Sequence, residues 1–259
     1  MAPVLLMAFE ATLLAGSPTP DAELDAALGL LGSRTVLFGH QSVGAGIVEG
    51  LRRQAQARGA PLRIVEARAG APLERRTLAH AYLAQNGDPV GKLAAFEALM
   101  AASESAPPDV AIFKLCWADF GPATDVDRLF AAYQATFDRL ARRFPRTAFL
   151  HLTTPLTTVQ GGTRAMLKRL LGKAPYGELE NARREAFNDL LRARHRGAEL
   201  LDLARLEAED PRGGLATHPV EGKPVLALAG ENTDDGGHLN PAAQDRVAKA
   251  LAVAIAKLR

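Results

Sequence analysis

The chain has 259 residues, of which 47% are hydrophobic and 23% are charged, and its formal net charge is +2. This composition excludes a disordered chain, and the length is enough to bury a sizeable core. The near balance of charge excludes the strong positive field expected of a nucleic-acid-binding protein. No apolar run reaches the roughly 18 residues of a membrane span, and a single cysteine, Cys116, excludes an intrachain disulfide. We therefore expect one domain over residues 21–259.

The first twenty residues read as an arm or the remnant of a leader. Residues 4–9 are apolar and residues 11–16 are mostly small, as in a secretion signal. However, Glu10 interrupts the apolar run, and the first basic residue of the chain is Arg34. The pattern slightly favours an exported protein over a cytoplasmic one, but it does not decide whether residues 1–20 are a leader.

Strand and helix patterns alternate along the rest of the chain. β-Branched and other apolar residues predict buried strands, and apolar residues three and four apart predict helices. The expected strands are 36–38, 62–67, 109–116, 147–152 and 198–203. The expected helices are 21–32, 43–58, a short and a longer one within 77–103, 127–144, a small basic one around 166–171, 178–194 and one after Pro241.

This alternation predicts an α/β fold, a three-layer α/β/α sandwich with about five parallel strands. Ligands of such sheets bind beyond the carboxyl ends of the strands. Residues 156–176 are long enough for a flap over such a site, and 211–230 is expected to be irregular. Three polar residues on one face of helix 178–194, Asn181, Arg184 and Asn188, could reach the flap, although a solvated face is the simpler interpretation.

Ser42 stands where the first strand turns into a helix. The hydroxyl of such a serine lies at the carboxyl edge of the sheet, and its N–H opens a helix, where a developing anion is favoured. On this stretch alone, a helix cap explains the serine at least as well as a nucleophile does.

A second stretch, 231–241, is dense in reactive side chains. Asp235 and His238 are three residues apart across two glycines, so the carboxylate can fold back onto one imidazole nitrogen. The other nitrogen is then free to take a proton from a hydroxyl, which is the logic of a serine triad. The three positions together favour catalysis by Ser42, Asp235 and His238 over coincidence.

These residues resemble those of the SGNH (GDSL-like) hydrolases. Residues 38–42 near the N-terminus, a glycine after the second strand and Asp235-Gly236-Gly237-His238 before the last helix carry the resemblance, which spans residues 35–258. It implies a flavodoxin-like sandwich and ester hydrolysis without a cofactor or metal. It further implies that Ser42 is the nucleophile, His238 the base and Asp235 its orienter, with the Ser42 and Gly70 N–H groups as oxyanion donors.

The sequence departs from the family pattern in two places. His40-Gln41-Ser42 replaces Gly-Asp-Ser, and residues 116–119 (Cys-Trp-Ala-Asp) stand where a Gly-x-Asn-Asp block supplies an oxyanion asparagine. The third donor could be Asn86, Gln41 or a backbone group. We expect four residues near Ser42 to bind substrate: His40, Gln41, Trp117 and Asp119.

Several other functions remain open. A non-catalytic carbohydrate- or nucleotide-binding module on the same fold is the main alternative. A metal site at 231–238 would need more ligands than this stretch offers. Cys116 ends a buried strand, which suits a core residue better than a nucleophile. An α/β-hydrolase would need its serine in a Gly-x-Ser-x-Gly motif. The expected partner is a small-molecule or carbohydrate ester; the substrate and the oligomeric state are not readable from the sequence.

Overall fold

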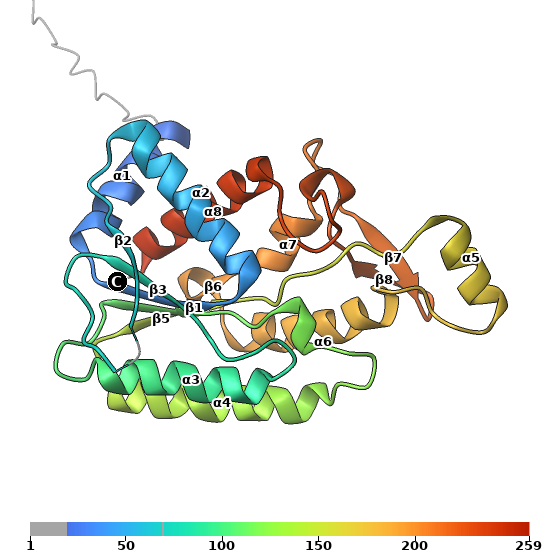
Figure 1. Ribbon diagram of the computed structural model, residues 1–259, viewed down its shortest axis with the longest axis horizontal. Helices are drawn as coiled ribbons and strands as arrows, with labels where there is room; N and C mark the ends of the chain where they lie inside the picture. The colour runs from blue at the N-terminus through green and yellow to red at the C-terminus, as the bar shows by residue number, and fades with distance from the viewer. Residues whose placement is uncertain (1–19, 69, 259) are drawn as a thin grey trace, which may run out of the picture.

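The computed structural model describes residues 20–68 and 70–258 (Figure 1). The leader expected within residues 1–20 therefore lies outside the described residues, apart from Pro20. The helices are α1 (Pro20–Ser33), α2 (Ser42–Arg58), α3 (Pro89–Ala102), α4 (Val126–Arg143), α5 (Gly162–Leu170), α6 (Glu178–Arg194), α7 (Leu203–Ala208) and α8 (Pro241–Lys257), with short 3-10 turns at Trp117–Asp119, Gly197–Glu199 and Gly230–Asn232. The strands are β1 (Val36–His40), β2 (Ile64–Glu66), β3 (Leu78–Tyr82), β4 (Val110–Phe113), β5 (Ala148–Leu152), β6 (Leu200–Leu201), β7 (Thr217–Val220) and β8 (Lys223–Leu226).

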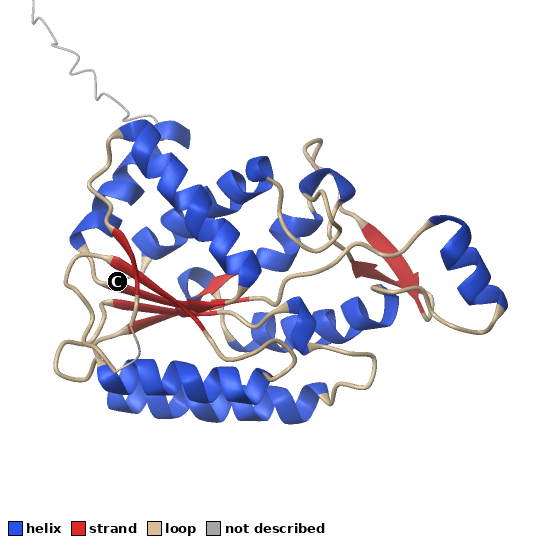
Figure 2. Cartoon of the chain, in the orientation of Figure 1, coloured by secondary structure: helices blue, strands red, loops and turns tan. Residues whose placement is uncertain are grey.

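Six strands form one parallel sheet in the order β2-β3-β1-β4-β5-β6. Without the edge strand β2, the remaining order is the flavodoxin-like 2-1-3-4-5. Helices cover both faces, with α1, α2 and α8 on one side and α3, α4 and α6 on the other (Figures 1 and 2). The predicted three-layer α/β/α sandwich is confirmed, with six strands in place of about five.

The additional strand, β3, was expected to be a short helix. Its sequence is Leu-Ala-His-Ala-Tyr, and alanine favours helices when local propensity alone decides. In the fold, β3 pairs along β1 from Val36↔Leu78 to His40↔Tyr82 and also pairs with β2. Burial between two strands outweighs the helical propensity, and β2 is displaced to the edge of the sheet.

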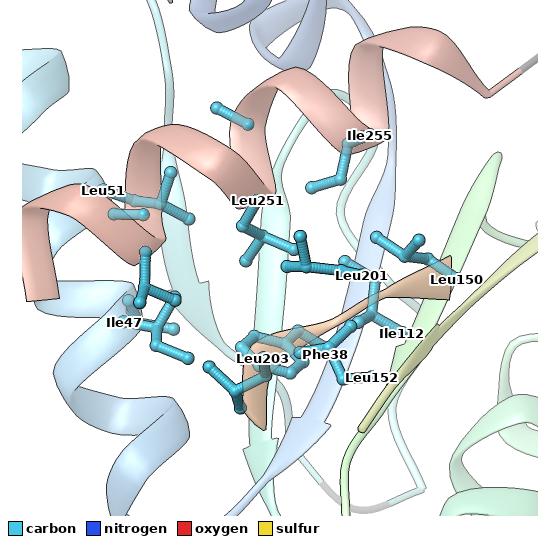
Figure 3. Close-up of a cluster of buried hydrophobic side chains, with 14 of the residues drawn as sticks. Phe38, Ile47, Leu51, Ile112, Leu150, Leu152, Leu201, Leu203, Leu251 and Ile255 are labelled. Carbon is cyan, nitrogen blue, oxygen red and sulfur yellow. The ribbon is translucent and has the colours of Figure 1, made fainter. Parts of the chain in front are cut away.

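Two apolar cores flank the sheet because successive residues of a buried strand face opposite sides. Phe38, Ile112 and Leu150 point towards α2 and α8 and meet Ile47 and Leu251 there (Figure 3). The α2–α8 contact is close, since a Cβ at Gly50 would lie 2.7 Å from the Gln244 carbonyl oxygen.

The opposite core is rich in aromatic rings. Leu37, Ala111 and Phe113 face α3 and α4, where they meet Phe96 and Tyr133. α4 begins at the cap Asp125, whose side chain accepts from the Arg128 N–H.

Two segments after β5 differ in how well they were predicted. The small basic helix within 156–176 is present as α5, whereas 211–230, expected to be irregular, contains the antiparallel hairpin β7–β8. Strand propensity there is interrupted by Pro219 and Pro224, which pair opposite each other. Over the described ranges, no helix has the length and apolarity needed to cross a bilayer.

Candidate active site

Ser42 is the first residue of α2, directly beyond the carboxyl end of β1. Gln41, not Ser42, is the cap residue, and its backbone is extended at φ −132°. The cap interpretation of Ser42 therefore does not describe this turn, because its hydroxyl engages His238 instead. No hydrogen-bond acceptor within the described residues meets the Ser42 N–H, as is usual for the first turn of a helix.

His40 supports this turn from within the protein. Its ring is fully buried, with Nδ1 2.9 Å from the Gln41 carbonyl oxygen and Nε2 3.1 Å from Nδ1 of His80. Burial lowers the pKa of His40 to about 3, so the ring is neutral at physiological pH. Since a carbonyl only accepts, Nδ1 carries the proton and Nε2 accepts from His80. The prediction that His40 binds substrate is corrected: it is a buried support of the turn.

Gln41 joins the turn to the neighbouring strand end. Its side-chain nitrogen donates to the carbonyls of Leu83 and Ala84, which follow β3. Both donors of that amide are engaged, which argues against Gln41 as an oxyanion donor, whereas its predicted contact with substrate stays a prediction. Gly44 allows the turn to close, because a Cβ there would overlap the His40 side chain.

The loop before α8 holds a carboxylate against an imidazole. Thr233 and Leu239 form an antiparallel bridge that closes the loop, and the Gly236 N–H donates to the Thr233 hydroxyl at 2.9 Å. Asp235 Oδ1 accepts from the N–H groups of Gly237 and His238 at 2.9 and 2.8 Å. Its Oδ2 lies 2.7 Å from His238 Nδ1.

The remaining imidazole nitrogen, His238 Nε2, lies 2.9 Å from Ser42 Oγ. The hydrogen bond from His238, together with the two backbone N–H groups, holds the pKa of Asp235 well below its usual range. Asp235 thus stays ionised and fixes the proton of His238 on Nδ1. This arrangement can transfer the Ser42 hydroxyl proton to Nε2.

Trp117 forms a wall beside His238. The rings meet edge to face with centroids 6.0 Å apart, and a Cβ at Gly237 would touch the indole at 3.4 Å. The indole Nε1 is buried and has no hydrogen-bond partner among the described residues. Trp117 is half-buried at the site, so its predicted contact with substrate stays a prediction.

Asp119 lies beneath the site rather than in it. Its side chain is fully buried and pairs with Lys92, whose Nζ lies 2.7 and 2.8 Å from the two carboxylate oxygens. The N–H groups of Gly87 and Cys116 donate to the same carboxylate at 2.9 and 2.7 Å. The prediction that Asp119 binds substrate is corrected, because three donor groups already satisfy its carboxylate with four hydrogen bonds and its side chain has no exposed surface.

Asn86 lies in the loop that follows β3, the strand beside β1. Its Oδ1 accepts from Lys92 Nζ at 3.0 Å. An ammonium group only donates, so Asn86 must turn its oxygen towards Lys92 and its NH₂ away. No bond within the described residues uses that NH₂ group.

Gly70 is separated from Ser42 by the sheet order. It follows β2, and β3 lies between β2 and β1, so the two strand ends are roughly 10 Å apart at about 4.8 Å per strand. Gly70 lines an apolar hollow with Tyr82 and Leu99 instead. The oxyanion role expected for Gly70 stays a prediction, and β3, not β2, takes the position beside β1.

The polar face of α6 is buried, in contrast to the solvated face that seemed simpler. Arg184 donates to the Trp117 carbonyl at 3.1 Å and to the Thr157 hydroxyl at 2.9 Å. Asn181 and Asn188 bond the backbone of Thr157 and Thr154. These side chains join the base of the 156–176 segment to the residues around Trp117.

Two further buried ionisable groups were missed by sequence reasoning. Burial raises the pKa of Glu207 to about 8, although its Oε2 accepts from the Leu156 N–H at 2.7 Å. Burial lowers the pKa of Lys114, which donates to the Leu115 carbonyl. Cys116 is buried beside them. Only the helical spacing of Glu207 behind Leu203 and Ala204 hinted that it faces inward.

No group of three or more His, Cys, Asp or Glu side chains is arranged to hold a metal ion in the described part of the chain. The site described above is therefore built from Ser42, His238 and Asp235 above a buried layer of polar side chains.

Comparison with protein-family models and with curated proteins gives no match. Solved structures do match. A Streptococcus pneumoniae protein provisionally assigned as a platelet activating factor is 14% identical, with a TM-score of 0.48 over 90% of this chain and 91% of that one. The periplasmic domain of a Salmonella ser. Paratyphi A lipopolysaccharide acetyltransferase is 13% identical, with a TM-score of 0.45 over 87% and 85%. A Corynascus thermopiles (Myceliophthora fergusii) carbohydrate esterase of family 2 is 17% identical, with a TM-score of 0.35 over 75% and 65%.

Proposed function

We propose that the protein is a serine hydrolase of SGNH type that cleaves an ester through an acyl-enzyme on Ser42. The observation that carries the proposal is the relay from Ser42 Oγ to His238 Nε2 at 2.9 Å and from His238 Nδ1 to Asp235 Oδ2 at 2.7 Å. It joins residues 196 positions apart in the chain, at the edge of the sheet where ligands bind.

In the first half-reaction, Ser42 Oγ attacks the ester carbonyl carbon and its proton passes to His238 Nε2. Asp235 stabilises the imidazolium that forms and remains ionised. The tetrahedral intermediate then collapses, its C–O bond to the alcohol breaks, and His238 returns the proton to the leaving oxygen. In the second half-reaction, water attacks the acyl group by the same steps and releases the acid.

The oxyanion would be stabilised by the Ser42 N–H and the Asn86 side-chain NH₂. The Ser42 N–H opens helix α2, whose N-terminus favours negative charge. Lys92 turns the Asn86 NH₂ away from itself, and Gln41 ties the loop after β3 to the Ser42 turn. Asn86 would thereby replace the asparagine missing from residues 116–119.

A fluorophosphonate probe and p-nitrophenyl acyl esters test this proposal. We expect the probe to label the protein and Ser42→Ala to remain unlabelled, with turnover lower by about 10⁴–10⁶-fold in Ser42→Ala and His238→Ala. Ser33→Ala, an exposed serine at the end of α1, is the matched control and should behave as the wild type. Labelling that persists in Ser42→Ala would overturn the assignment. A folded protein with no labelling and no turnover at any acyl length would favour the non-catalytic binding module.

A further inference from the structure

Helix α5 turns its apolar side chains outward. Ala165 is the one buried residue that α5 has, and the side chains opposite it are large and apolar. Four are strongly exposed: Met166 at 66%, Leu167 at 58%, Leu170 at 74% and Leu171 at 65%. A surface helix of a soluble protein normally has the reverse orientation, so this face needs a partner.

Basic side chains border this apolar face on both sides. Residues 157–177 contain Arg164, Lys168, Arg169 and Lys173 and no acidic residue. Arg169 pairs with Glu178 at 2.7 Å, whereas the other three cations have no ion-pair partner among the described residues. The partner must therefore be apolar and carry negative charge.

α5 also stands apart from the body of the protein. It lies at one tip of the molecule, beyond the β7–β8 hairpin (Figure 1). It makes no extensive contact with another helix or strand of the described chain. A projecting helix can lie on an extended, deformable surface such as a lipid bilayer. A second copy of the same face would bring like charges together.

We propose that α5 is a docking helix for an anionic lipid surface. Met166, Leu167, Leu170 and Leu171 (the apolar face of α5) would enter the boundary between headgroups and acyl chains, while the flanking Arg and Lys side chains meet the anionic headgroups. This is surface binding by α5, whose nine residues are too few to cross a bilayer. It does not depend on the proposed esterase activity.

The base of α5 connects this docking face to the candidate active site. The Thr158 N–H donates to the Gly236 carbonyl at 2.9 Å, and a Cβ at Gly236 would lie 2.7 Å from the Thr158 hydroxyl. Gly236 lies between Asp235 and His238. A protein bound through α5 would therefore hold the loop that carries these residues near the lipid surface.

Cosedimentation of the full chain with vesicles tests the proposal. We expect binding to vesicles of phosphatidylcholine mixed with phosphatidylserine, and much weaker binding to phosphatidylcholine alone. Raising the ionic strength from about 0.1 M to about 1 M should weaken binding, because the Debye length falls from about 10 Å to about 3 Å. Ser42→Ala should bind as the wild type does, which separates docking from catalysis.

Two variants of α5 identify the face. Leu167→Ser/Leu170→Ser should weaken binding by about tenfold or more for each side chain. Arg164→Glu/Lys173→Glu should weaken it by at least about fivefold for each charge. The matched controls are Val90→Ser, an exposed apolar residue on α3, and Arg142→Glu/Arg146→Glu at the end of α4. Both controls should bind as the wild type does.

Three outcomes would overturn the proposal. The first is no binding to anionic vesicles, and the second is binding that the α5 variants leave unchanged. The third is a dimer in solution that Leu167→Ser/Leu170→Ser converts to monomer without any vesicle binding, since a second copy would then cover the face. Because all these variants are at exposed positions, circular dichroism should show the wild-type fold in each.

Discussion

Two side-chain pairs, one in the candidate site and one beneath it, are held in opposite ways. Asp235 and His238 are three residues apart, and their side chains are 57% and 44% exposed. Lys92 and Asp119 are 27 residues apart, and both side chains are fully buried. The first pair is organised by its own loop, and the second joins helix α3 to the 3-10 turn that follows β4.

This difference indicates that the exposed pair serves proton transfer and the buried pair serves structural support. An exposed pair can change its protonation without a large desolvation cost, which suits proton transfer at Ser42. Removing one partner of a buried pair leaves an unpaired charge in the interior, which costs several kcal/mol of stability. A buried pair therefore holds the groups bonded to it in place. Through its bonds to Asn86, Gly87 and Cys116, the Lys92–Asp119 pair joins the loop after β3 to the 3-10 turn that carries Trp117.

The sharpest test of the comparison is Asp235→Asn. We expect kcat for p-nitrophenyl esters to fall by about 10⁴-fold, because the amide no longer holds His238 in the required tautomer. The free energy of unfolding should change by no more than about 1 kcal/mol, because the pair is exposed and the amide oxygen can still accept from the N–H groups of Gly237 and His238. Asp234→Asn is the neighbouring control. A large loss of stability in Asp235→Asn would contradict the separation of roles.

For Lys92→Met we expect the main effect on the free energy of unfolding rather than on kcat. It leaves the Asp119 carboxylate buried and unpaired, so the free energy of unfolding should fall by about 3–5 kcal/mol in urea denaturation. Arg139→Met, which removes the exposed partner of Glu97, should cost no more than about 1 kcal/mol. Equal effects in the two variants would show that the buried pair has no special structural role.

Asn86→Ala tests whether the buried pair also serves catalysis. Removing one oxyanion donor should lower kcat by about 10²–10³-fold with little change in KM. The free energy of unfolding should fall by no more than about 3 kcal/mol, because the buried Lys92 ammonium loses the Asn86 Oδ1 acceptor but keeps Asp119. Gln85→Ala, one residue earlier in the same loop, is the control. A kcat within a factor of about two of the wild type would place the donor elsewhere, since the expected loss is at least about 100-fold.

Glu207→Gln extends the comparison to a second buried group. The pKa of Glu207 is raised to about 8 in the folded protein, against about 4.3 when unfolded, so the folded state holds the extra proton between these values. Stability from this residue is therefore present below pH about 4.3 and lost as pH rises towards 8, by at most about 1.4 kcal/mol per pH unit.

The glutamine variant has no such proton, so it should gain stability relative to the wild type as pH rises. Urea unfolding of both proteins across this range measures the difference. Because buried histidines such as His40 titrate in both proteins, only the difference isolates Glu207. A difference independent of pH would show that the Glu207 pKa is not raised.

The parts of the site readable from sequence are those governed by local geometry. The spacing of Asp235 and His238 and the strand-to-helix turn at Ser42 depend on a few consecutive residues, and the structure brings these three side chains together. Hydrophobic periodicity likewise located most helices, because an apolar stripe must face the sheet.

The parts that sequence reasoning missed depend on distant partners. The sequence around Lys92 does not indicate that Asp119 is its partner. A buried charge can be interpreted only when its partner is known. The alanines of β3 favour a helix until β1 and β2 are placed on either side.

The Gly44 contact with His40 has a consequence for the whole turn. At this point the chain folds back so closely that residues 40 and 44 share one small volume. Where the related motif has glycine, this chain has an imidazole at 40, and position 44 has no side chain to compete with it. Position 40 therefore carries the side chain and position 44 carries none, and a side chain added at Gly44 would collide with His40 within the turn that holds Ser42.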